Sequence, residues 1–117
     1  MAITPGTYNM TVQRRADHSI QLVFKDSTNS AINLSGYTVA AQVWDKDRKV
    51  KFADFTVTYT NRVTGTVDIA LTDVQTASFI RDSVLYYDVL LTDASGLKEY
   101  YLEGNINVSE GYTAWLL

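Results

Sequence analysis

Hydrophobic and polar residues alternate along most of the chain with a period of two, which is the pattern of strands buried on one face. Residues 37–44 and 84–92 are apolar on both faces, as is typical of central strands or of strands whose second face is covered. Short segments rich in Gly, Asn, Asp and Ser separate the strands. The pattern predicts seven strands, at residues 7–13, 18–25, 37–44, 55–60, 65–71, 84–92 and 98–108.

One short helical turn is predicted near residues 73–79. Thr72 and Gln75 have the spacing of a capping box, in which each side chain bonds the backbone of the other residue. The turn is expected to end near Phe79, whose ring closes one end of the core. Antiparallel strands in this number, with one helical turn, predict an all-β fold: an immunoglobulin-like antiparallel β-sandwich, with a small barrel as the alternative.

The chain of 117 residues is long enough for one compact core, so residues 1–117 are predicted to form a single domain. Short extensions are expected at residues 1–6 and 111–117. Both extensions carry apolar residues, so we expect one of them to lie against another polypeptide. The alternation places six residues in the core: Tyr37, Val39, Leu71, Tyr87, Val89 and Leu102.

Composition and charge narrow the possible partners. The net charge is −3, and the few Lys and Arg residues form no broad basic surface, so nucleic acid is not an expected partner. The chain has no cysteine, which excludes a disulfide framework and a thiolate metal site. It shows no signal peptide and no apolar run of the roughly 20 residues that span a membrane, so no membrane association is expected.

The residues that could carry chemistry are few. His18 is the only histidine, and it is expected to be a surface residue in the turn before a strand. The acidic pairs Asp45/Asp47 and Glu99/Glu103 are expected to be solvated, and the first pair to belong to a turn rather than to a calcium loop. No phosphate-binding glycine motif is present. The sequence therefore predicts no catalytic residues, no metal site and no cofactor, and a protein that is not an enzyme.

Several aromatic residues fall outside the predicted core. Trp44, Tyr86 and Tyr101 lie on the faces opposite the core positions, where they could contact another protein, bind a glycan or be covered within the domain. The C-terminal apolar residues either form a last strand or insert into another chain. The interface candidates are Trp44, Tyr86, Tyr101, Tyr112, Trp115, Leu116 and Leu117.

Five elements follow one another in a recognisable order. They are an Asn-Leu-Ser-Gly turn at 33–36, a Tyr-x-Val-x-Ala-x-Val strand at 37–43, Gly-x-Val-x-Ile-x-Leu-Thr at 65–72, Tyr-x-Asp-Val at 86–89 and an acidic-Gly-x-x-x-Val strand at 103–108. In this order and spacing, residues 19–113 resemble the immunoglobulin-like domain at the N-terminus of phage baseplate upper proteins and related tail-appendage proteins.

The resemblance implies a structural protein of the bacteriophage virion, assembled in the host cytoplasm. Such a protein acts as an adaptor in the tail, at the baseplate, neck or fibre attachment. It contacts other virion structural proteins and is present in several symmetry-related copies. The alternatives are a carbohydrate-binding module for host attachment, which the outward aromatic residues favour, and a capsid decoration protein.

Overall fold

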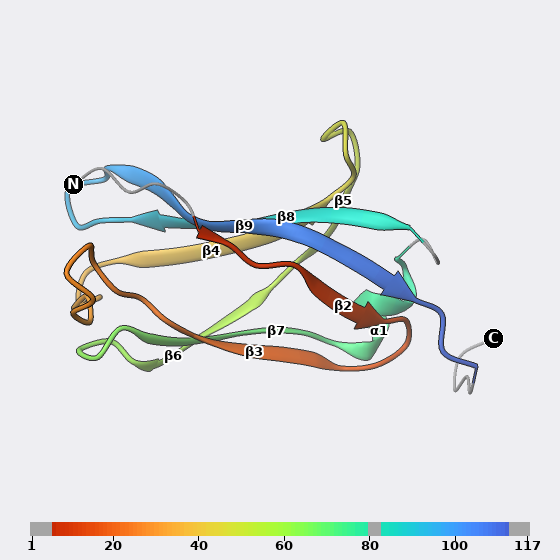
Figure 1. The fold of residues 1–117 in the computed structure, drawn as a ribbon, viewed down its shortest axis with the longest axis horizontal. Helices are drawn as coiled ribbons and strands as arrows, with labels where there is room; N and C mark the ends of the chain where they lie inside the picture. Colours follow the sequence, from red (N-terminus) through yellow and green to blue (C-terminus); the bar gives the residue numbers. More distant parts are fainter. Residues whose placement is uncertain (1–5, 80–82, 113–117) are drawn as a thin grey trace.

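The computed structural model describes residues 6–79 and 83–112, which form two β-sheets packed face to face (Figure 1). The strands are β1 (Gly6–Thr7), β2 (Met10–Gln13), β3 (His18–Val23), β4 (Thr38–Trp44), β5 (Lys51–Asp54), β6 (Thr56–Asn61), β7 (Thr66–Leu71), β8 (Val84–Thr92) and β9 (Lys98–Ser109), and α1 (Asp73–Ala77) lies between β7 and β8. The larger sheet has the order β1-β9-β8-β4-β5, with β2 also paired to β9. The smaller sheet has the order β3-β7-β6. The predicted fold class, an immunoglobulin-like β-sandwich with one short helix, is confirmed.

All seven predicted strands are present, and two details differ. The segment predicted as one strand at 7–13 is divided into β1 and β2, which both run parallel to β9. The strand β5 was not predicted, because its four residues include two charged ones that resemble a loop. Ala53 is its buried residue and pairs with Val43 of β4. Pairing to a neighbouring strand, rather than a local pattern, makes this segment a strand.

The interruption between β1 and β2 is fixed by contacts with the neighbouring strands. The Tyr8 N–H donates to the Glu103 carbonyl at 3.0 Å, and the Tyr8 carbonyl accepts from the Tyr87 hydroxyl. The Asn9 side chain accepts from the Asn105 N–H at 2.9 Å. A Cβ at Gly104 would lie 2.0 Å from the Tyr8 carbonyl oxygen, so this close approach of two backbones requires glycine.

The core lies between the two sheets. Val39, Leu71, Tyr87 and Val89 are buried as predicted. Tyr37 and Leu102 are partly buried and pack against the core. Tyr37 directly precedes β4, whose first residue, Thr38, pairs with Thr92 beside the β8–β9 hairpin.

The helix α1 closes one end of the sandwich (Figure 1). The predicted capping box is present: Thr72 Oγ1 accepts from the Gln75 N–H at 3.2 Å, and Gln75 Oε1 accepts from the Thr72 N–H at 2.8 Å. The chain beyond the helix brings Phe79 into the core, where it is 1% exposed and packs edge-on against Phe52. The prediction of a short helix followed by a core aromatic is therefore confirmed.

A bulge in β9 reverses the predicted faces of two tyrosines. Val89 pairs with Leu102 while the next residue, Leu90, pairs with Tyr100, so Tyr101 is the extra residue. Tyr101 turns inward, and its hydroxyl accepts from the Lys25 N–H at 2.8 Å. Tyr100 points outward and is 51% exposed. The prediction that Tyr101 faces outward is wrong, because one extra residue exchanges the two faces of a strand.

Glu110 and Gly111, which follow β9, are held to the two arginines that follow β2. Arg14 donates to the Glu110 carboxylate at 2.7 Å, and Arg15 donates to the carbonyl oxygens of Glu110 and Gly111 at 2.9 and 2.6 Å. The hydrogen bond from Arg14, together with Arg15, lowers the pKa of the Glu110 carboxyl. These contacts hold the chain to the domain as far as Gly111.

Tyr112 follows directly and is 99% exposed. Gly6, expected in the N-terminal extension, belongs to β1. Residues 1–5 and the interface candidates Trp115, Leu116 and Leu117 lie outside the described residues.

Candidate binding groove

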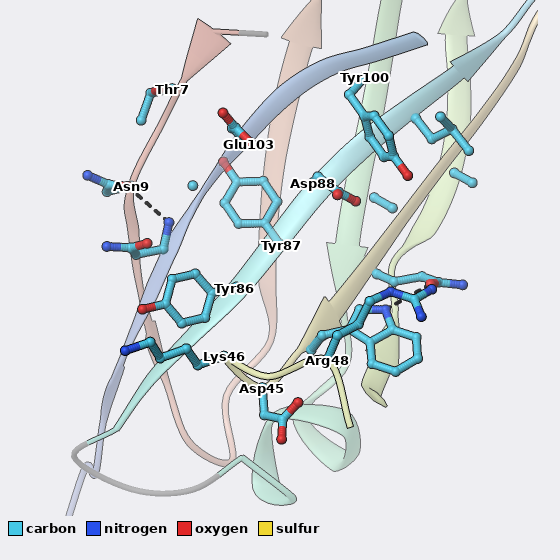
Figure 2. Close-up of a pocket in the computed structure, with 17 residues that line it drawn as sticks. Thr7, Asn9, Asp45, Lys46, Arg48, Tyr86, Tyr87, Asp88, Tyr100 and Glu103 are labelled. Atoms are coloured by element: carbon cyan, nitrogen blue, oxygen red, sulfur yellow. Dashed lines mark hydrogen bonds between the residues drawn. The ribbon is translucent and has the colours of Figure 1, made fainter. Parts of the chain in front are cut away.

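The outer face of the larger sheet is hollowed by a groove of about 650 Å³. It is formed by outward side chains of β4, β8 and β9, and it is bordered by β1 and by the hairpin between β4 and β5 (Figure 2). This face points away from the core, so its side chains are not needed to cover the other sheet. The groove is the candidate functional site of the protein.

Strand register arranges the outward side chains in three rows that cross β4, β8 and β9. The first row consists of Ala40, Leu90 and Tyr100; the carboxylate row of Gln42, Asp88 and Glu103; and the aromatic row of Trp44, Tyr86 and Asn105. Neighbouring rows lie about 7 Å apart, because their residues are two positions apart along β4 and along β8. A polar row is thus flanked on both sides by rows that contain an aromatic ring.

Trp44 lies on the outward face, as predicted, but it is half-buried. Its indole N–H donates to Gln42 Oε1 at 2.9 Å, and the Arg48 guanidinium lies 4.3 Å from the centre of its ring. The hairpin that carries Arg48 is tied down by Asp45, whose carboxylate accepts from the N–H groups of Lys49 and Val50 at 2.7 and 3.1 Å. The prediction that this acidic segment is a turn is confirmed.

The second predicted aromatic, Tyr86, also lies on the outward face, where it is paired with Trp44 across β4 and β8. It is 36% exposed. Tyr100 lies on the same face but was not predicted as a site residue. Two adjacent tyrosines in β9 gave no local signal for which one faces inward, and only the bulge decides it.

Asp88 and Glu103 stand directly opposite each other on β8 and β9. Within residues 6–79 and 83–112, neither carboxylate accepts a hydrogen bond or forms an ion pair. Burial raises the pKa of the Asp88 carboxyl, Glu103 raises it further and Arg48 lowers it. The groove therefore holds two neighbouring acidic groups whose charge is not matched by a direct partner in the described part of the chain.

The acidic pairs considered from the sequence, Asp45/Asp47 and Glu99/Glu103, do not include Asp88. Glu99 and Glu103 were expected together on the outward face of one strand. The bulge places them on opposite faces, because Glu99 pairs with the buried Leu91 while Glu103 pairs with the outward Asp88. Asp88 was not predicted as a site residue, because its neighbour Glu103 lies on a different strand and no short sequence spacing connects the two residues.

His18 differs from its prediction as well. It is the first residue of β3 rather than a surface turn residue, and it is half-buried. Burial lowers the pKa of its imidazole, and among the described residues Nε2 has no hydrogen-bond partner. His18 lies on the smaller sheet and is not part of the groove.

The described part of the chain has neither a cluster of metal ligands nor a membrane-spanning helix. Between residues 6 and 79 and between 83 and 112, no three His, Cys, Asp or Glu side chains gather as metal ligands would. No helix in the described part of the chain is long and apolar enough to cross a membrane.

No family model matches the chain, and no curated protein matches it in sequence. Among solved structures, the crystal structure of the Lin-41 filamin domain is similar to this chain, with 17% sequence identity and a TM-score of 0.48. The similarity covers 86% of this chain and 84% of that one.

Proposed function

We propose that this protein is a structural adaptor of a bacteriophage tail, which binds other virion proteins at the baseplate, neck or fibre attachment. The observation that carries the proposal is the groove, an open concave surface with outward aromatic rings around an acidic pair. Aromatic side chains are enriched where proteins bind one another. The assignment to a virion rests on the order and spacing of the five sequence elements between residues 33 and 108.

The smaller sheet offers a second surface for contacts. Its edge strand β6 consists of Thr, Val, Tyr and Asn residues and carries no charge. Edge strands of proteins that stay alone are commonly protected by charged residues, whereas an unprotected edge can pair with a strand of another chain. An adaptor needs at least two such surfaces, and the groove and the β6 edge lie on different sheets. In a tail, several symmetry-related copies would use both.

A carbohydrate-binding module for host attachment is the second candidate. Tyr86 and Tyr100 favour it, because both rings are exposed beside polar side chains that could bond sugar hydroxyls. Two other aromatics speak against it. Tyr101 turns inward and packs against Phe24, and one face of the Trp44 ring is covered by Arg48. Both contacts leave less surface on which a sugar ring could stack. A glycan array probed with the protein and with Tyr86→Ala separates this candidate from the adaptor.

The adaptor proposal is tested in virions of the phage whose genome encodes the chain. Mass spectrometry of purified particles should detect the chain in several copies per virion. Chemical cross-linking should then connect Lys46, beside the groove, to a tail protein. Cross-links to the major capsid protein alone would favour a capsid decoration protein. Absence of the chain from purified virions would refute the proposal.

A further inference from the structure

We infer that the groove binds a basic side chain, a lysine or an arginine, of the partner protein, with the charged end between Asp88 and Glu103. The inference rests on the proposed function, since it names the chemical group by which the adaptor recognises its neighbour. It is drawn from the carboxylate row and from the aromatic residues on both sides of it.

The first argument is charge. Two carboxylates directly opposite each other on neighbouring strands repel, and this arrangement destabilises a sheet. A carboxylate can only accept hydrogen bonds, so a ligand that fits between Asp88 and Glu103 must supply donors. A guanidinium or an ammonium group supplies several donors together with the missing positive charge. Burial and the neighbouring Glu103 raise the pKa of the Asp88 carboxyl, and a bound cation would act in the opposite direction by favouring the ionised carboxylate.

The second argument is the shape of the groove. Figure 2 shows the Asp88 carboxylate between the rings of Tyr100 and Tyr86. Both tyrosines are exposed, and they lie in the rows on either side of the carboxylate row. The methylene groups of a long basic side chain can pack against such rings while its charged end reaches the acids. A short or purely apolar side chain would fill the space and leave the carboxylates unmatched.

Among the described residues, two cations of the protein line the groove, Lys46 and Arg48, and neither forms an ion pair with Asp88 or Glu103. Arg48 is near enough to lower the pKa of Asp88, but its guanidinium lies over the Trp44 ring and forms no ion pair with Asp88. The Asp45 carboxylate that holds the hairpin fixes the turn from which Arg48 extends. The space between Tyr86 and Tyr100 therefore stays open for a basic group from another chain.

The test uses the isolated full-length chain and three short peptides, acetyl-Gly-Lys-Gly-amide, acetyl-Gly-Arg-Gly-amide and the neutral citrulline analogue of the arginine peptide. Binding is followed by NMR at the backbone amides of Asp88 and Glu103 and at the Trp44 indole N–H. We expect saturable shifts with a basic peptide, and an affinity at least tenfold lower for the citrulline peptide.

Two variants test whether binding of the basic peptides depends on Asp88 and Glu103. The double variant Asp88→Asn, Glu103→Gln keeps the size of both side chains and should lower the affinity at least tenfold. Asp68→Asn removes one acidic charge from β7 of the smaller sheet and should leave the affinity unchanged. Equal shifts with the basic and citrulline peptides, or unaltered binding by the double variant, would overturn the inference. The inference would also be overturned if added oligosaccharides, and none of the three peptides, shifted the NMR signals of Asp88, Glu103 and Trp44.

The outcome is separable from that of the proposed function. If the chain is found among tail proteins but binds no basic peptide at the groove, only the inference fails. If the chain is absent from virions but binds the basic peptides through Asp88 and Glu103, the adaptor proposal fails and the ligand chemistry stands.

Discussion

The ring of Tyr101 in β9 stacks on the ring of Phe24, the residue that follows β3, with 4.4 Å between their centroids and 28° between their planes. This contact exists because the bulge in β9 turns Tyr101 inward. The same bulge turns Tyr100 outward into the groove. One extra strand residue therefore packs Tyr101 against Phe24 and supplies a wall of the groove at Tyr100.

The two adjacent tyrosines should consequently respond differently to mutation. Tyr101→Ala removes a ring packed in the sandwich and should lower the free energy of unfolding by about 2 kcal/mol or more. Tyr100→Ala removes a surface ring and should change it by less than about 0.5 kcal/mol. Urea denaturation of both variants measures the difference. A larger loss for Tyr100→Ala would mean that the bulge is placed wrongly.

Gly104→Ala should detach the first strand segment from β9. The new Cβ would lie 2.0 Å from the Tyr8 carbonyl oxygen, so the backbone at Tyr8 must move, at a cost of about 1–3 kcal/mol. Hydrogen exchange should show lost protection at the Tyr8 amide. Gly6→Ala is the matched control, since its Cβ would meet Leu102 at an ordinary 3.7 Å. Retained Tyr8 protection in Gly104→Ala would contradict the close approach.

Asp88→Asn should stabilise the protein at pH 7. Burial and the neighbouring Glu103 raise the folded-state pKa of Asp88, so the ionised carboxylate is disfavoured in the fold. The ionised Asp88 lowers the stability of the fold once the pH has risen through the raised folded-state pKa. This loss is absent at a pH below the pKa that Asp88 has in the unfolded chain. Removing the charge should therefore add about 0.2–1 kcal/mol at pH 7. Thermal unfolding should show this gain shrinking at pH 3, and destabilisation at pH 7 would argue against an unmatched acidic pair.

His18 should make stability depend on pH just below neutrality. Burial lowers its folded-state pKa, so the unfolded chain binds the proton more readily. Stability should then decrease as the pH falls through about 6.5 towards the folded-state pKa. Urea midpoints at pH 7.5 and 5.5 measure this decrease, and His18→Leu should reduce it. If His18→Leu shows an equal decrease in stability, His18 is not the cause of the decrease. The fold lowers the carboxyl pKa values of Asp26, Asp93 and Glu110, and these groups affect stability only at lower pH.

Local sequence patterns were sufficient for much of the fold. Alternation located the strands, the Thr72 and Gln75 spacing located α1, and the apolar alternation placed Trp44 and Tyr86 on the outward face. These features depend on residues close together in the chain. The groove depends instead on register between strands, which brings Asp88 to Glu103 and moves Tyr100 outward through the bulge. No short-range spacing contains that information.

In the proposed adaptor, the groove faces another protein in the assembled particle. Because the chain has no cysteine, single cysteines report on chosen positions. Ala40→Cys places a thiol in the groove, and Ser19→Cys places one on β3 of the smaller sheet, away from the β6 edge, as a comparison; both positions are exposed in the free chain. Maleimide labelling should be at least tenfold slower for Ala40→Cys in virions than in the free protein. Labelling of Ala40→Cys at the same rate in virions and in free protein would show that the groove is open in the particle and would contradict the account.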